Sequence, residues 1–132
     1  MKADGFGRLP LHYAALDGDV AAIETRLAAG DAIDLGDGQG LTPLHFAAQS
    51  GCMAAAALLL DRGAEVDKPD RFGNTPLWVA VFNSRGDGDL IMLLRDRGAD
   101  PFHANERGKT PVGLARLIAN HDVARFFADL PG

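Results

Sequence analysis

The chain has little cysteine and no long apolar run, and both shortages narrow the classes of protein it can belong to. Cys52 is the only cysteine among 132 residues, so no disulfide can form within the chain, which fits a reducing compartment. No apolar stretch approaches the roughly 20 residues that are needed to cross a bilayer. The first residues, Met1 to His12, lack the apolar core of a secretory signal. We therefore expect a cytoplasmic protein with no membrane contact.

Basic residues are also scarce. Lys and Arg number 13 against 18 Asp and Glu, which gives a formal net charge of −5. Most of the deficit lies at the N-terminal end, where residues 1–37 hold seven acids and three bases. Nucleic-acid-binding proteins usually cluster Lys and Arg on one face, so we expect no nucleic-acid partner. An acidic N-terminal half instead suits a basic protein partner, such as a nuclease, through electrostatic steering.

Motifs for catalysis or cofactor binding are missing as well. The glycine-rich residues 36–40 match neither a dinucleotide-binding nor a Walker sequence. Residues 87–89, Asp-Gly-Asp, lack the further oxygen ligands of a calcium loop. Ser50 and Ser84 stand beside no assignable general base. We expect no enzymatic activity, no cofactor and no metal site.

What the chain does contain is an internal repeat. Pro10, Pro43 and Pro76 are 33 residues apart, and Pro111 follows after 35. Two further markers keep the same distance from each proline: Asp4, Asp37, Asp70 or Asn105 six residues before it, and Gly7, Gly40, Gly73 or Gly108 three before it. Such a period predicts a repeat architecture. We divide residues 1–132, as one domain, into units of about 4–36, 37–69, 70–104 and 105–130.

Each unit predicts a turn followed by two short helices. Asp or Asn with Gly supplies the turn, and Thr-Pro then supplies an N-cap and a first helical residue. Leu9 replaces the threonine in the first unit, so we expect that helix to start less firmly. The first helices should break at Gly18, at Gly51, near Gly86 and at Ala119, and the second helices of the first three units should end at Gly30, Gly63 and Gly98.

Helix pairs this short can bury their apolar faces only by stacking on one another. Equivalent positions predict one continuous spine: Leu11, Leu44, Leu77 and Val112, with Ala14, Ala47, Ala80 and Ala115 allowing close approach. A second layer should contain Leu58–Leu59, Leu93–Leu94 and Phe126–Phe127. The predicted fold is all-α: a solenoid of stacked antiparallel helix pairs with protruding β-turn or hairpin loops.

The motif Thr-Pro-Leu-His-x-Ala at this period resembles the ankyrin repeat family. Unit two is close to the family pattern. Unit three departs from it, because Trp78 replaces the histidine and two residues are inserted between the helices. Unit four departs further, with Gly113 in place of His and Ala119 in place of Gly, and is similar to a C-terminal cap.

The histidine of the motif invites a catalytic or metal-binding interpretation, which the repeat itself argues against. The four equivalent positions hold His12, His45, Trp78 and Gly113. A catalytic base or a ligand would not be repeated and then exchanged for an indole or a hydrogen. The resemblance implies that this histidine is structural and bonds to the adjacent Thr hydroxyl and to turn backbone.

The resemblance also implies that the chain binds proteins through its turn tips and through the exposed face of the first helices. Carried over position by position, it predicts these binding residues: Phe6, Arg8, Asp17, Gln39, Leu41, Gln49, Arg71, Phe72, Asn74, Phe82, Asn83 and Arg107. The phenylalanines stand where a polar residue would serve stability equally well, and aromatic side chains often carry binding energy. The alternative is that each one packs against its neighbouring turn and is largely covered.

Two functions remain open at this point. The chain is either a general interaction module, monomeric and without catalysis, or a dedicated inhibitor of the immunity type, which occludes the active site of a cognate enzyme or toxin. Affinity separates them, because an inhibitor should bind one partner with sub-nanomolar affinity and a scaffold should bind several at micromolar levels.

Overall fold

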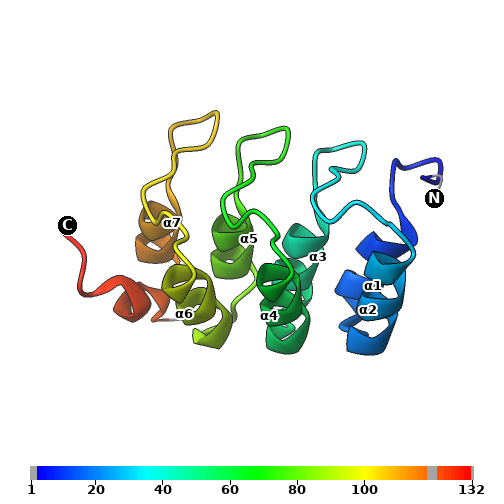
Figure 1. Ribbon diagram of the computed structural model, residues 1–132. Coiled ribbons are helices and arrows are strands. Elements are labelled where there is room, and N and C mark those ends of the chain that lie inside the picture. Colours follow the sequence, from blue (N-terminus) through cyan, green and yellow to red (C-terminus); the bar gives the residue numbers. More distant parts are fainter. Residues whose placement is uncertain (1–2, 119–121, 132) are drawn as a thin grey trace.

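A computed structural model describes residues 3–118 and 122–131, and within these residues the chain is helical and contains no strand. Four units follow one another along the molecule (Figure 1). The helices are α1 (Pro10–Asp17), α2 (Val20–Ala28), α3 (Pro43–Ser50), α4 (Met53–Asp61), α5 (Pro76–Phe82), α6 (Asp89–Asp96), α7 (Pro111–Leu117) and the 3-10 helix η1 (Val123–Phe127). The predicted solenoid of stacked helix pairs is confirmed.

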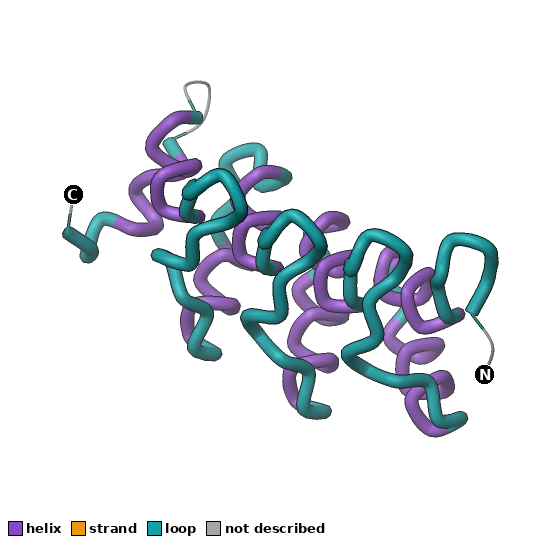
Figure 2. The backbone as a smooth tube through the Cα atoms, turned by 90° about the horizontal axis from the view of Figure 1, so that it is seen from above, coloured by secondary structure: helices purple, strands orange, loops and turns teal. Residues whose placement is uncertain are grey.

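The first helix of each unit (α1, α3, α5 or α7) is called an inner helix here, and α2, α4 and α6 are called outer helices. Each unit begins with a hairpin-like turn, called a finger: finger 1 is residues 4–8, finger 2 is 37–41, finger 3 is 70–74 and finger 4 is 105–109. The fingers project from the same side of the array and stand side by side when viewed from above (Figures 1 and 2). Fingers and inner helices together present one continuous face.

Backbone hydrogen bonds join each finger to the next. Gly38 N–H donates to Phe6 C=O over 2.8 Å, and Glu106 N–H donates to Phe72 C=O over 3.0 Å. Between them, Arg71 N–H donates to Gln39 C=O over 2.9 Å. Gly40 explains why the motif needs glycine here, because its φ is +79° and a Cβ would stand 2.8 Å from Arg71 N. The fingers are therefore held in register, although none forms a strand within the described residues.

The inner helices begin as the sequence predicts and end less regularly. The hydroxyls of Thr42, Thr75 and Thr110 accept the N–H three residues on, whereas Leu9 offers α1 no such bond. The predicted break near Gly86 is wrong, because α5 already ends at Phe82. The next residue, Asn83, donates both its backbone N–H and its side-chain amide to Val79 C=O, over 3.0 and 2.9 Å. The break predicted at Ala119 lies outside the described residues.

The predicted spine forms the core. Leu11, Leu44, Leu77 and Val112 are buried, and so are the four alanines expected beside them. Of the second layer, Leu59, Leu94 and Phe127 are buried, whereas their neighbours Leu58, Leu93 and Phe126 are half-buried. In the fourth unit the short 3-10 helix η1 takes the place of an outer helix and brings Phe127 into the core.

Candidate protein-binding face

His45 links its own helix to the next finger. Its ring is buried, with 1% of the residue exposed. Nδ1 accepts the Thr42 N–H over 3.0 Å and lies 2.8 Å from the Thr42 hydroxyl. Because Nδ1 is an acceptor, the ring proton is on Nε2, which donates to Asn74 C=O over 2.8 Å. Burial lowers the pKa of His45, although the bond to Asn74 partly opposes this, so the ring is held neutral.

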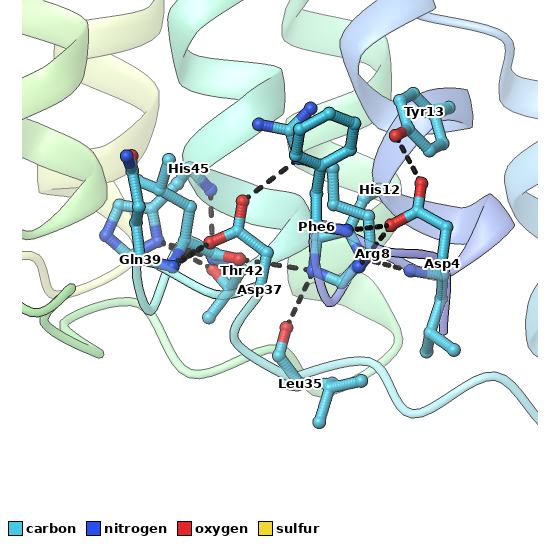
Figure 3. Close-up of polar contacts among 12 residues, drawn as sticks. Asp4, Phe6, Arg8, His12, Tyr13, Leu35, Asp37, Gln39, Thr42 and His45 are labelled. Carbon is cyan, nitrogen blue, oxygen red and sulfur yellow. Dashed lines mark hydrogen bonds and ion pairs between the residues drawn. The ribbon is translucent and has the colours of Figure 1, made fainter. Parts of the chain in front are cut away.

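His12 has the equivalent arrangement in the first unit (Figure 3). Its Nδ1 accepts the Leu9 N–H over 2.9 Å, so Nε2–H donates to Leu35 C=O over 2.8 Å and to Leu41 C=O over 3.1 Å. All polar ring atoms of both histidines are therefore used in holding backbone together. The structural role that the sequence predicts for this position is the one the geometry supports.

Trp78 and Gly113 leave this pattern incomplete in the third and fourth units. An indole has no acceptor nitrogen, so Trp78 cannot bond the N–H of Thr75 as a histidine would. The contact that is present runs the other way: the backbone N–H of Trp78 donates to the Thr75 hydroxyl over 3.5 Å. Finger 4 therefore lacks the histidine bond that ties down fingers 2 and 3.

Arg8, a predicted binding residue, is engaged within the protein. Its Nε donates to the buried carboxylate of Asp37 over 3.1 Å, which joins fingers 1 and 2 (Figure 3). Its guanidinium also lies about 5 Å from the ring centres of Phe6 and Phe46. Nearby, a hydrogen bond from the Tyr13 hydroxyl lowers the pKa of Asp4. Arg8 is thus at least as much a structural link as a contact residue.

Leu41 and Asn74 are also built into the repeat. Both are half-buried; Leu41 packs against the core, and Asn74 accepts the His45 bond through its carbonyl. The side-chain oxygen of Asn74 accepts a bond from the Asn105 amide over 2.9 Å, which joins fingers 3 and 4.

The predicted phenylalanines are exposed. The exposed fraction is 67% for Phe6, 50% for Phe72 and 68% for Phe82. The alternative that each is largely covered by its neighbouring turn is therefore wrong. The guanidinium of Arg71 lies over the Phe72 ring, 5.3 Å from its centre, and leaves half of the side chain free. These are the side chains that a partner could cover most readily.

Three adjoining hollows on this face share one residue, Trp78. The first, about 280 Å³, lies at the tips of fingers 3 and 4; the second, about 440 Å³, lies along α5; the third, about 310 Å³, lies along α7. We call them together the Trp78 groove. It is lined by six of the predicted binding residues: Gln49, Phe72, Asn74, Phe82, Asn83 and Arg107.

The other predicted residues lie elsewhere. Phe6, Gln39, Leu41 and Arg71 belong to fingers 1 to 3 and line none of the three hollows. Arg8 and Asp17 line a separate hollow of about 460 Å³ at the N-terminal end of the array, which Tyr13 also lines. The structure thus divides the predicted binding residues among the Trp78 groove, the hollow at the N-terminal end and fingers 1 to 3.

Among the groove residues that the sequence interpretation missed are Trp78 and Leu117. Trp78 was noted only as a replacement for the motif histidine. Leu117 is 72% exposed, six residues after Pro111, and so is equivalent to Gln49 and Phe82. Applying the same register to the fourth unit would have found it.

Charge is distributed unevenly between the two sides of the molecule. The fingers and inner helices carry as many acids as bases: Asp4, Asp17, Asp37, Asp70 and Glu106 against Arg8, Arg71, Arg107, Lys109 and Arg116. The whole net charge of −5 therefore lies outside them, mainly on the outer helices and the loops that follow. The overall charge consequently does not describe the face on which the Trp78 groove lies.

Comparison with known families agrees with this geometry. A family model described as ankyrin repeats (3 copies) matches residues 1–70, and one described as ankyrin repeat matches residues 72–106. The chain belongs to the ankyrin repeat family. Ankyrin repeats are generally protein–protein interaction modules and typically have no enzymatic activity. A search of curated proteins found no significant match.

In this ankyrin repeat protein, residues 3–118 and 122–131 contain no group of three His, Cys, Asp or Glu side chains that could hold a metal ion. Over the same residues, no helix has the length and apolar character needed to span a membrane.

Proposed function

We propose that the protein is a non-enzymatic interaction module that binds another protein through the Trp78 groove and the neighbouring finger tips. The observation that carries this proposal is the exposure of Phe72, Phe82 and Leu117 around one groove. The core of the repeat does not need these side chains, whereas exposed apolar groups of this kind often mark an interaction site. We further propose that it acts as a monomeric single domain in the cytoplasm.

Affinity capture tests this proposal. Wild-type protein and a Phe72→Asp, Phe82→Asp variant are immobilised and exposed to a lysate of the source cells, and bound proteins are identified by mass spectrometry. Both substitutions are at exposed side chains, so the variant should keep the helical circular dichroism signal of the wild type. We expect a protein that wild type captures and the variant does not.

A matched control places the same two charges on the opposite side. Val20 and Met53 are exposed and begin the outer helices α2 and α4, where an aspartate also interacts favourably with the helix N-terminus. The Val20→Asp, Met53→Asp variant should capture the same protein as wild type. Equal capture by all three proteins would refute binding through the groove.

A dedicated inhibitor of the immunity type is the second candidate. The net charge of −5 favours it, because long-range attraction accelerates association with a basic enzyme or toxin. The captured partner decides between the two. Sub-nanomolar binding to a single enzyme, with loss of that enzyme's activity, would identify an inhibitor, and micromolar binding to several proteins would identify a general module.

A further inference from the structure

We infer that the Trp78 groove takes an acidic segment of its partner, with an apolar side chain between the acids. This inference rests on the proposed function and specifies the chemistry of the bound segment. It differs from what the overall charge of the chain suggests, because the groove and the rest of the surface carry opposite charge.

The apolar part of the inference comes from the loss of the motif histidine in units three and four. Trp78 borders all three hollows. In the third hollow it faces Leu114 and Leu117 of α7, and Gly113 contributes no side chain. His12 and His45, at the equivalent positions of the first two units, are buried and bond backbone groups, whereas Trp78 is half-buried and contributes aromatic surface to the groove. A leucine or phenylalanine of a partner would find apolar surface on Trp78 and Leu117.

The acidic part comes from the cations beside the groove. Arg107 lines the first hollow and Lys109 the third, while Arg71 stacks on Phe72 at the edge of the first. All three are exposed, and none is in an ion pair with another described residue. Glu106 is the one acid among the lining residues of the three hollows. A partner segment with two or more carboxylates would complement this charge.

The indole N–H of Trp78 adds a polar contact. It has no hydrogen-bond acceptor within residues 3–118 and 122–131, and it is not among the buried unpaired polar atoms. It is therefore accessible to solvent and is free to donate to a carboxylate or to a backbone carbonyl of a bound segment.

Three peptides of about 15 residues, each about 50 Å long when extended, test the inference. The first intersperses glutamates with leucine and phenylalanine; the second has every glutamate replaced by lysine; the third has every leucine and phenylalanine replaced by serine. Trp78 is the only tryptophan, so its emission reports occupation of the groove directly. We expect the first peptide to shift this emission and to bind at least about tenfold more tightly than the other two. Raising the salt from about 0.1 M to about 1 M shortens the screening length from about 10 Å to about 3 Å and should weaken binding.

Two variants that change the net charge by the same amount test whether the peptide binds at the groove. Arg107→Glu should weaken the first peptide by about tenfold or more, because it reverses a charge at the groove. Arg62→Glu makes the same change at the C-terminal end of the outer helix α4, where Arg62 pairs with Glu24 of α2, and should leave the affinity unchanged.

Tighter binding of the lysine peptide, or equal effects of the two variants, would overturn the acidic-segment inference. A lysine peptide that still shifted Trp78 emission would leave the proposed function standing, with a basic segment as the ligand. If no peptide shifts the emission, the inference is overturned, and the capture experiment decides the proposed function independently.

Discussion

Replacing His45 with alanine should destabilise the protein because it leaves the Thr42 N–H without its acceptor and removes one of the two donors to Asn74 C=O. Nδ1 is the acceptor for the Thr42 N–H, and Nε2 is the donor to Asn74 C=O. An unsatisfied buried polar group costs about 1–3 kcal/mol. The Asn74 carbonyl still accepts the Asp70 N–H over 2.9 Å, so its contribution is that of one lost hydrogen bond, about 0.5–1.5 kcal/mol. We therefore expect a loss of roughly 2–4 kcal/mol, a large share of the roughly 5–15 kcal/mol by which domains are stable.

Urea unfolding followed by circular dichroism measures this loss. With a slope of about 1–3 kcal/mol per molar urea, the midpoint should fall by about 1 M or more. His103→Ala is the matched control, since His103 lies in a loop and its ring makes no hydrogen bond with another described residue; its stability should change by less than about 0.5 kcal/mol. Unchanged stability of His45→Ala, together with loss of partner binding, would refute the structural role of His45.

Three further predictions concern stability. Leu44→Ala should lower the free energy of unfolding by about 2–5 kcal/mol in chemical denaturation, because Leu44 is buried in the spine. Leu117→Ala, at an exposed site, should lower it by less than about 0.5 kcal/mol. Similar losses in the two variants would contradict the assigned core. Gly113→His should raise the free energy of unfolding by about 0.5–1.5 kcal/mol, because it removes a helical glycine and supplies an acceptor for the Thr110 N–H. A melting temperature below that of the wild type would show that the site cannot accept the histidine ring. Lowering the pH below about 6.5, the ordinary His value, should destabilise the wild type, because the pKa of His45 is lowered in the fold and the unfolded chain then binds the additional proton. Part of this pH dependence should be lost in His45→Ala. The raised pKa of Asp67 acts in the opposite direction, but it is common to both proteins. Identical slopes of stability against pH in the two proteins would contradict a lowered pKa of His45.

The fold could be predicted almost completely from the sequence because its determinants are local and repeated. The Thr-Pro caps, the turn glycines and the spine leucines recur at fixed distances, so the structure predicted for one unit is supported by the same residues in the next unit. The end of α5 could not be predicted, because Asn83 stands at its C-cap, where α1 and α3 have Gly18 and Gly51.

The candidate site was harder to predict, because it depends on contacts between units. Nothing in the sequence shows that Arg8 bonds the buried Asp37 of the next finger. The exposure of Phe72 and Phe82 also depends on how the units stack. Trp78 was visible only as a departure from the motif, and its position between the hollows required the structure.

The most direct test of the central claim is to map the captured partner on the protein by NMR. A chain of 132 residues is small enough for assigned amide spectra, and changes in amide shifts on titration locate the contact. We expect the largest changes at Phe72, Trp78, Phe82 and Leu117 and in finger 4, with α2 and α4 little affected. Shift changes confined to the outer helices, with no change at the residues of the Trp78 groove, would contradict binding through this groove.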